Sequence, residues 1–248
     1  MTDVVLVGFK RTPFHPANKG ALTKVRPDDL LAAAIRGLLA ETGVDANLIE
    51  DLIVGCAFPE AEQGFNIGRI VGQLVGLPVT VAGVTVNRFC GSSMQAIHMA
   101  AGAINSGAGE AFLCGGVESM TRIPMGGFNP MPNPALVKSY PQAYIGMGET
   151  AENVGKKYGI TRVAQEEFAL KSHQKAAAAA AAGKFKDEIV AIGDVASDGC
   201  IRPETTMEAM ATLKPAFDTA GTVTAATSSP VTDGAAVTLV CSAEFAKK

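Results

Sequence analysis

The sequence predicts a mixed α/β fold in which a layered βαβαβ sheet is covered by helices and interrupted by an inserted loop region. Three observations support this. Apolar β-like runs alternate with helical patterns over the first 120 residues, and the composition, with 48% hydrophobic and 18% charged residues, is typical of a globular α/β protein. The length of 248 residues exceeds a typical single domain, so we expect one large domain with a substantial insertion.

Short apolar runs predict the strands of this sheet. Four of them precede residue 120, at residues 4–8, 52–58, 83–86 and 111–117. A fifth run, at 235–241, adds a last strand to the same sheet. Because helices separate the first four runs, we expect right-handed crossovers and a largely parallel sheet that is covered on both faces.

Three helices are predicted between the strands. The first opens at residues 26–29 with Asp28 as its cap, and Gly43 ends it. The second covers residues 67–77. In the third, residues 91–106, the positions between the periodic apolar residues are also small or apolar, so we expect this helix to be buried nearly all round.

The amino-acid composition changes after the fourth strand, where methionine, proline and glycine are frequent and indicate a loop. Helical patterns follow at 150–157 and 162–183, the second with a run of alanines that favours a helix. We therefore expect residues 1–120 and 230–248 to form one α/β domain, and residues 121–229 to be inserted into it.

Charge and hydropathy exclude several classes of protein. The formal net charge is only -3 and there is no long basic run, so we expect no nucleic-acid partner. No apolar run approaches the roughly 20 residues of a membrane-spanning helix. The first residues lack the layout of a signal peptide, so we expect a cytoplasmic protein without a membrane span.

The cysteines are odd in number, widely spaced and free of any C-x-x-C pair, which argues against a disulfide framework and against a metal site. They are Cys56, Cys90, Cys114, Cys200 and Cys241. Three of them, Cys56, Cys114 and Cys241, lie in apolar β runs and are expected to be packing residues. Cys200 follows an Asp-Gly pair in a predicted loop, where an exposed thiol is expected.

Cys90 is the residue that points to chemistry. It lies between a strand and the amino terminus of a helix, where unpaired N–H groups and the helix dipole favour a thiolate. Gly91 allows a tight turn beside the sulfur, and the backbone N–H of Cys90 is a candidate donor to an oxyanion. The alternative is an ordinary buried thiol, the commoner state of a cysteine between apolar segments.

The segment V-N-R-F-C-G-S-S at 86–93, followed by C-G-G-V-E-S-M-T at 114–121, resembles the signature region of thiolases, which make or cleave 3-ketoacyl-coenzyme A. Further matches occur in the same order and extend the resemblance over essentially the whole chain. They are R-T-P-F (11–14), T-A-E-N-V (150–154), G-K-F-K-D-E-I-V (183–190), K-P-A-F (214–217) and V-T-A-A-T-S-S-P-V-T-D-G-A-A (223–236).

The resemblance implies a thiolase-type acyltransferase (acetyl-CoA C-acyltransferase) of fatty acid metabolism, with coenzyme A or acyl-CoA as substrate and no permanently bound cofactor. It implies that Cys90 becomes acylated and that Ser229 contacts the pantetheine arm. Met147 falls in the segment that lines the pantetheine channel, and Arg202 and Lys214 resemble basic positions near the nucleotide end. The alternative for the two basic residues is an ordinary solvated charge.

Thiolases have two halves of similar fold, and the second supplies a G-H-P histidine, an N-E-x-F asparagine and the cysteine of a C-x-G motif. Neither G-H-P nor N-E-x-F occurs in the 248 residues, and the one C-x-G string, at 114–116, belongs to the signature segment C-G-G-V-E-S-M-T. The histidines are His15, His98, which we expect to be a core residue, and His173, which we expect to be solvated. The sequence therefore corresponds to an amino-terminal half, with the carboxy-terminal half absent and activity on its own in doubt.

Three interpretations follow: a subunit of a split thiolase, a fragment of a longer chain, or a non-catalytic CoA-thioester-binding or scaffold protein. A half-thiolase would expose the apolar surface meant for its other half, so we expect a homo-oligomer or a separate chain that carries that half. A ketoacyl synthase relative is a further alternative, against which the N-x-x-C-G-S context and the long insertion stand. Both thiolytic cleavage and condensation to acetoacetyl-CoA remain open.

Overall fold

The computed structural model describes residues 2–248 and divides the chain into two compact units. Unit 1 comprises Met1–Phe128, Asp187–Gly199 and Val231–Lys248, and unit 2 comprises Asn129–Lys186 and Cys200–Pro230. Residues 187–199, which the sequence places in the inserted region, pack with unit 1.

Arg11 explains this packing. Its guanidinium donates to both carboxylate oxygens of Asp198, at 2.7 and 2.8 Å, and its Nε donates to Glu188 at 2.7 Å. The backbone N–H of Val190 also donates to the carbonyl of Arg11. The R-T-P-F segment thus holds a distant stretch of chain against the first strand.

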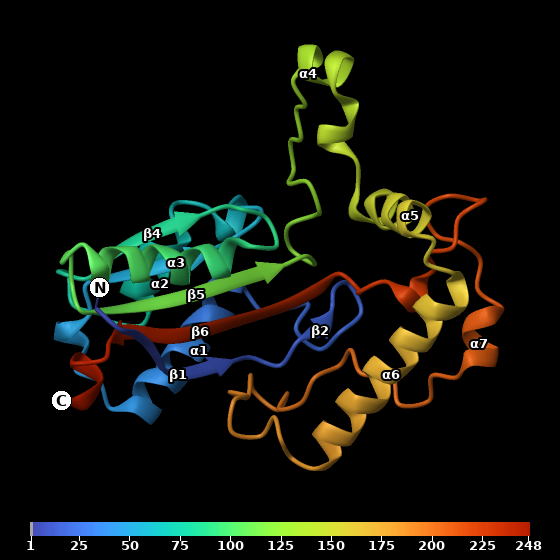
Figure 1. Cartoon of the computed structure of the whole chain (residues 1–248). Helices are drawn as coiled ribbons and strands as arrows, with labels where there is room; N and C mark the ends of the chain where they lie inside the picture. The colour runs from blue at the N-terminus through green and yellow to red at the C-terminus, as the bar shows by residue number, and fades with distance from the viewer. Residues whose placement is uncertain (1) are drawn as a thin grey trace. The chain divides into compact units, whose positions relative to one another are not determined.

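Unit 1 is built on a sheet with the strand order β1-β6-β5-β3-β4, and β2 pairs with β6 (Figure 1). The strands are β1 (Val4–Arg11), β2 (His15–Pro16), β3 (Asp51–Gly55), β4 (Ala82–Val86), β5 (Ala111–Ser119) and β6 (Thr232–Ser242). β3 pairs in parallel with β4 and β5, whereas β6 is antiparallel to β1 and β5. The predicted last strand exists, but it runs through the middle of the sheet. The chain re-enters opposite Ser119, where β5 ends, and must therefore run back along β5.

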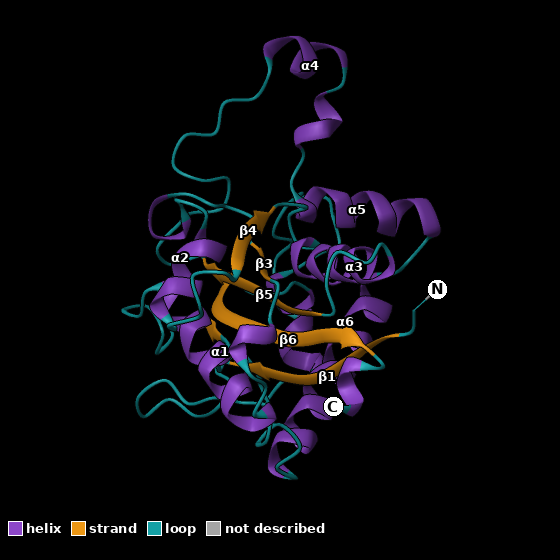
Figure 2. Ribbon diagram, turned by 90° about the vertical axis from the view of Figure 1, so that its left-hand side faces the viewer, coloured by secondary structure: helices purple, strands orange, loops and turns teal. Residues whose placement is uncertain are grey.

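Helices cover both faces of this sheet, as predicted: α1 (Pro27–Thr42) and α2 (Ile67–Leu74) on one face and α3 (Ser92–Asn105) on the other (Figure 2). The alternation of side chains along β3 explains the two layers, because Leu52 and Val54 belong to the cluster with α1 and α2, and Ile53 to the cluster with α3.

The start of α1 corrects one expectation. The cap position is Arg26, which has no side-chain cap bond, and Pro27 occupies the first turn. Proline lacks an N–H and has a helical φ, so it starts the helix without a capping side chain. Asp28 lies inside the helix and accepts hydrogen bonds from the Arg26 guanidinium. Gly43 ends the helix in the left-handed conformation, at φ 64°, as predicted.

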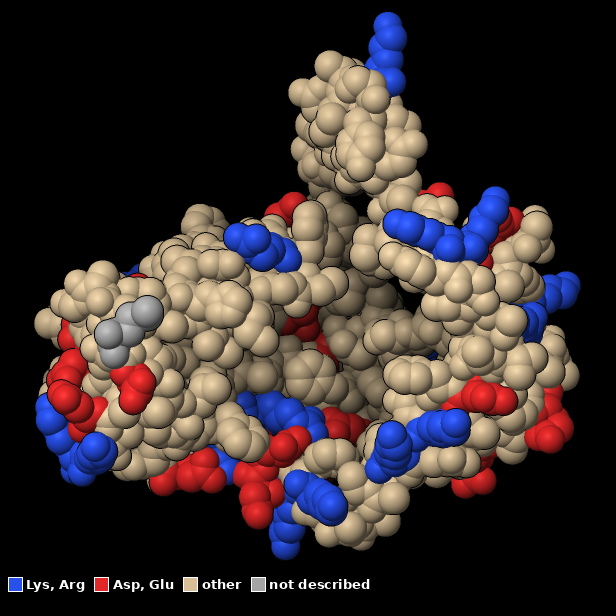
Figure 3. All heavy atoms as spheres, viewed as in Figure 1, with Lys and Arg blue, Asp and Glu red and all other residues tan. Residues whose placement is uncertain are grey.

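The prediction that α3 is buried nearly all round is wrong. Its buried residues form a single stripe, Ser92, Ala96, Ala100 and Ile104. Met94 and Met99 are 57% and 39% exposed, and His98 is exposed rather than a core residue. Because α3 lies on the sheet with one face only, its small and apolar outer positions face solvent. The surface over α3 is largely uncharged in Figure 3.

Unit 2 is mainly helical. It contains α4 (Pro134–Ser139), α5 (Met147–Tyr158), α6 (Arg162–Ala181) and α7 (Met207–Ala211). Thus the helices predicted at 150–157 and 162–183 both form, and α6 begins after Thr161, whose Oγ1 accepts the N–H of Ala164. Across residues 2–248, no helix combines the length and the hydropathy needed to cross a membrane.

Two paired glycines on the parallel strands β3 and β5 set the position of α3. Gly55 ends β3 and Gly116 pairs with it on β5. A Cβ on Gly55 would overlap the backbone of Ser92 and Ser93, and one on Gly116 would overlap the side chain of Ser93. The first turn of α3 therefore lies directly on these two glycines.

We expect Gly55→Ala to lower the free energy of unfolding by about 2 kcal/mol, because the added methyl group meets backbone that cannot move alone. Urea unfolding followed by circular dichroism measures this. Gly102→Ala, in α3, is the matched control. Nothing lies within 4 Å of the Cβ it adds, so it should raise the free energy of unfolding by roughly 0.5 kcal/mol. Equal stability of the two variants would contradict the close contact.

Candidate active site

Cys90 lies in the turn that joins β4 to α3, and its side chain is exposed. The preceding residue, Phe89, has φ 45°, in the left-handed region. That conformation is strained for a bulky side chain and persists only where the surroundings hold it. The turn therefore depends on contacts that fix Phe89.

Hydrogen bonds hold the backbone of Phe89 on both sides. Its N–H donates to Oδ1 of Asn87 at 2.8 Å. Its carbonyl accepts the N–H of Ser92 at 3.0 Å and the hydroxyl of Ser92 at 2.5 Å. The Ser92 hydroxyl also accepts the N–H of Arg88 at 2.8 Å. These bonds place Cys90 immediately before the first turn of α3. Within residues 2–248, neither the N–H nor the sulfur of Cys90 has a hydrogen-bond partner.

A polar cluster, in which Gln63 is buried, Glu118 is partly buried and Asn87 is exposed, adjoins this turn. Asn87 donates from Nδ2 to the carbonyl of Ala57 at 2.9 Å, and the N–H of Ala57 donates to Glu118 at 2.7 Å. The other Glu118 oxygen accepts Nε2 of Gln63 at 2.6 Å, and Gln63 is fully buried. Sequence reasoning missed Asn87, Gln63 and Glu118, although two of them lie in the signature segments.

Asp233 joins the ends of β5 and β6. It is fully buried, and its carboxylate accepts the Ser119 hydroxyl at 3.1 Å and the N–H and hydroxyl of Thr121 at 2.9 and 2.5 Å. Sequence reasoning also missed this residue. The signal was an aspartate beside an apolar strand, because such a carboxylate needs donors when it is buried.

The predicted packing cysteines are buried. Burial raises the pKa of the Cys56 thiol from 9.0 to about 12, with a contribution from the nearby Glu118 charge. Burial and then Asp51 likewise raise the pKa of Cys114 to about 12. Burial also raises the pKa of Cys241. These thiols are therefore neutral near pH 7, and only Cys90 among the five is exposed.

Unit 2 contains a cavity of about 300 Å³. The polar and aromatic residues that line it include His173, Cys200, Arg202, Phe217, Ser228 and Ser229. The structure thus brings together two of the residues predicted to contact coenzyme A, Arg202 and Ser229. His173 is half-buried rather than solvated, because its Nδ1 accepts the backbone N–H of Arg202 at 3.1 Å.

The other two predicted contacts, Met147 and Lys214, are exposed and are not among the residues that line the cavity. Met147 is 69% exposed at the start of α5. The next residue, Gly148, is covered by the ring of Phe217, since an added Cβ would overlap that ring. Met147 therefore precedes in sequence a glycine that packs against Phe217, which lines the cavity.

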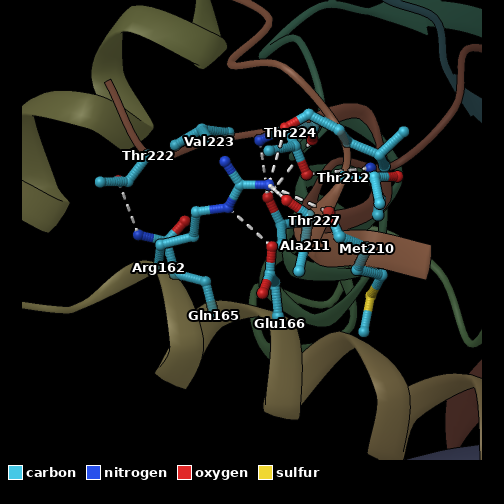
Figure 4. Close-up of polar contacts among 12 residues, drawn as sticks. Arg162, Gln165, Glu166, Met210, Ala211, Thr212, Thr222, Val223, Thr224 and Thr227 are labelled. Atoms are coloured by element: carbon cyan, nitrogen blue, oxygen red, sulfur yellow. Dashed lines mark hydrogen bonds and ion pairs between the residues drawn. The ribbon is translucent and has the colours of Figure 1, made fainter. Parts of the chain in front are cut away.

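Arg162 fixes part of the chain that leads to the cavity (Figure 4). Its Nε donates to Glu166, which is 3% exposed, at 2.7 Å. Its Nη2 donates to the carbonyls of Met210, Ala211 and Leu213 at 3.0, 3.2 and 2.7 Å. One guanidinium therefore satisfies the carbonyls at the end of α7.

Glu152 fixes the segment that enters the other wall. Its carboxylate accepts the N–H groups of Thr222 and Val223, at 3.0 and 2.8 Å. Gln165 donates to the Thr222 hydroxyl at 3.0 Å (Figure 4). Glu152 lies in T-A-E-N-V and Val223 begins the V-T-A-A-T-S-S segment, so two motifs that are distant in sequence meet through these bonds.

Comparisons with known proteins agree with this arrangement. The family described as thiolase, N-terminal domain, matches residues 4–244. The chain belongs to the thiolase family. It is 46% identical to a 3-ketoacyl-CoA thiolase of Bacillus subtilis over 99% of this chain and 67% of that protein. It is 49% identical to one of Saccharophagus degradans over 97% of this chain and 64% of that protein.

A solved structure gives the same result for the fold. Human mitochondrial 3-ketoacyl-CoA thiolase in complex with CoA superposes with a TM-score of 0.87 at 33% identity, covering 99% of this chain and 66% of that one. This confirms the predicted thiolase-like α/β fold. The chain spans about two thirds of the length of the thiolases it matches.

We expect iodoacetamide at pH 8 to modify Cys90 in the native protein and to leave Cys56 and Cys114 unmodified. The thiolate is the reactive form, and a thiol with a pKa of about 12 is ionised at roughly one part in ten thousand at pH 8. Peptide mass spectrometry measures the modification.

The same labelling in urea is the control, and there all five cysteines should react. Modification of Cys56 or Cys114 at the rate of Cys90 under native conditions would contradict their burial.

The buried thiols of Cys56 and Cys114 also make the stability depend on pH. The pKa of each thiol is higher in the folded than in the unfolded protein, so the free energy of unfolding should fall as the pH rises from 9.0 toward 12.

Proposed function

We propose that this chain carries the acyl-accepting part of a thiolase and transfers acyl groups between coenzyme A thioesters in fatty acid metabolism. The position of Cys90 carries this proposal. Its exposed sulfur follows a strained residue and precedes the amino terminus of α3, which is where an activated nucleophile is expected.

In the proposed reaction the Cys90 thiolate attacks the carbonyl carbon of an acyl-CoA, or the 3-keto carbonyl of a 3-ketoacyl-CoA. A carbon–sulfur bond forms, and the backbone N–H of Cys90 donates to the oxyanion. The coenzyme A thiolate, or the acetyl-CoA carbanion, departs with the bonding electron pair and takes up a proton. Coenzyme A or acetyl-CoA then accepts the acyl group from the cysteine.

The proton transfers need groups that the described residues do not offer: the sequence contains no G-H-P motif, and its one C-x-G string starts at Cys114, which is buried in β5. We propose that the remaining part of the thiolase fold supplies them, either from a separate chain or from a continuation of this one. The exposed apolar positions of α3, Met94 and Met99, support such an association, and a homo-oligomer is part of the proposal. We place the protein in the cytoplasm.

Unit 2 is proposed to bind coenzyme A with no permanently held cofactor. Arg202 on the cavity wall offers a positive charge to phosphate groups, and Ser229 offers a hydroxyl to the pantetheine arm. Lys214 and Met147 are proposed as further contacts outside this cavity. The rival function is a binding or scaffold protein that holds a CoA thioester without being acylated, and the missing motifs favour it.

Acylation tests the proposal directly. We expect acetyl-CoA, mixed with this chain and with a thiolase carboxy-terminal part that carries the G-H-P and C-x-G motifs, to add one acetyl group to Cys90. Intact-mass spectrometry and peptide mapping measure the adduct. Cys90→Ala should abolish it, whereas Cys241→Ala, which changes a cysteine outside the proposed coenzyme A cavity, should retain it. No adduct in the complete mixture, or one that survives Cys90→Ala, would leave only the binding function.

Calorimetry with coenzyme A tests unit 2. We expect Arg202→Ala to weaken binding about tenfold, because a charge-assisted hydrogen bond is lost. Ser229→Ala should have a smaller effect in the same direction. Lys138→Ala removes an exposed positive charge that is not part of the cavity. The affinity of this variant for coenzyme A should equal that of the unaltered chain. Equal losses for Arg202→Ala and Lys138→Ala would indicate attraction by net charge alone.

A further inference from the structure

The strained turn at Phe89 needs support beyond its own neighbours in sequence. Its N–H is held by Oδ1 of Asn87, whose own side chain must be fixed if that bond is to be rigid. Nδ2 of Asn87 donates to the carbonyl of Ala57, which lies two residues beyond the end of β3. The conformation of Phe89 therefore depends on where the Ala57 peptide lies.

Glu118 fixes that peptide. One of its carboxylate oxygens accepts the N–H of Ala57 at 2.7 Å, and the other accepts the amide of the fully buried Gln63 at 2.6 Å. Gln63 in turn accepts the N–H of Ser119 at 2.7 Å, so Glu118 connects the segment after β3 to the end of β5. Ala57 thus donates one hydrogen bond to Glu118 and accepts one from Asn87.

The chemistry of the cluster requires a carboxylate at position 118. All the groups that face its oxygens are donors: the Ala57 N–H, the Gln63 amide and, at 3.8 Å, the Cys56 thiol. An ionised carboxylate only accepts hydrogen bonds, whereas a glutamine would turn an NH₂ group toward one of these donors. A glutamine can keep one of the two short bonds, and an alanine keeps neither.

We propose that Glu118 is a positioning residue for the nucleophile: acting through Ala57 and Asn87, it holds Phe89 in the left-handed conformation and so keeps Cys90 at the amino terminus of α3. The catalytic meaning of this role rests on the proposed function. The chain of hydrogen bonds from Glu118 through Ala57 and Asn87 to Phe89, called the relay below, does not rest on the proposed function, because it ends at the backbone next to Cys90.

The test measures the rate of Cys90 alkylation by iodoacetamide together with the hydrogen exchange of the Ala57 and Phe89 amides. We expect Glu118→Ala and Asn87→Ala each to slow alkylation at least about fivefold, the effect of losing one hydrogen bond. In Glu118→Ala the Phe89 amide should lose protection although Glu118 does not touch it. Glu118→Gln should restore part of both signals.

Two matched controls separate positioning from general destabilisation. Glu110→Ala removes a carboxylate just before the opposite end of β5, and Asn105→Ala removes an amide at the far end of α3. In both variants the rate of Cys90 alkylation should lie within about twofold of the rate in the unaltered protein. The double variant Glu118→Ala/Asn87→Ala should be no slower than the slower single variant, because the two residues act in one path.

The proposal is overturned if Glu118→Ala leaves both the alkylation rate and the Phe89 protection unchanged, or if Glu110→Ala slows alkylation equally. Should Glu118→Ala not fold, Glu118→Gln and Asn87→Ala decide by the same criteria. Alkylation needs no acyl-CoA and no second chain. A protein that is never acylated but shows the expected relay effects would refute the proposed function alone, and the converse result would refute the relay alone.

Discussion

The structure depends on the close approach of the first turn of α3 to β3 and β5. That approach requires glycine at positions 55 and 116, because any side chain there would overlap Ser92 or Ser93. It brings the end of β4 and the start of α3 so near that the connection between them must turn sharply, and Phe89 takes a left-handed conformation as a result. Backbone packing therefore accounts for the sharp turn that precedes the exposed Cys90.

Packing places the turn, and buried polar groups hold it. The strand ends leave N–H groups that no ladder satisfies, and Glu118, Gln63 and Asp233 accept several of them. A buried polar side chain is costly unless it is hydrogen-bonded, so Gln63 and Asp233, which are both fully buried, favour this arrangement of the strand ends. The same interactions that satisfy the carboxylates therefore make the geometry around Cys90 specific.

Sequence reasoning succeeded where the signal is local. Three predicted features depend only on residues that are near one another in sequence: the apolar strands, the end of α1 at Gly43, and the order strand, Cys90, helix. The structure contains all three. It failed where a partner distant in sequence decides the outcome. The exposed face of α3 depends on what covers the helix, and the role of Glu118 depends on Ala57, 61 residues away. Periodicity cannot reveal either, because it reports amphipathicity and not the identity of the neighbour.

The way in which the insertion joins the sheet explains how one chain can combine the turn at Cys90 with a second compact unit. β5 ends at Ser119 and β6 begins opposite it, and Asp233 bonds to Ser119 and Thr121 across this junction. Both ends of the inserted segment are thus fixed within unit 1. The cavity walls of unit 2 are held by contacts of their own, from Glu152 and Arg162. Substitutions that reshape the cavity can therefore leave intact the bonds that hold the turn before Cys90.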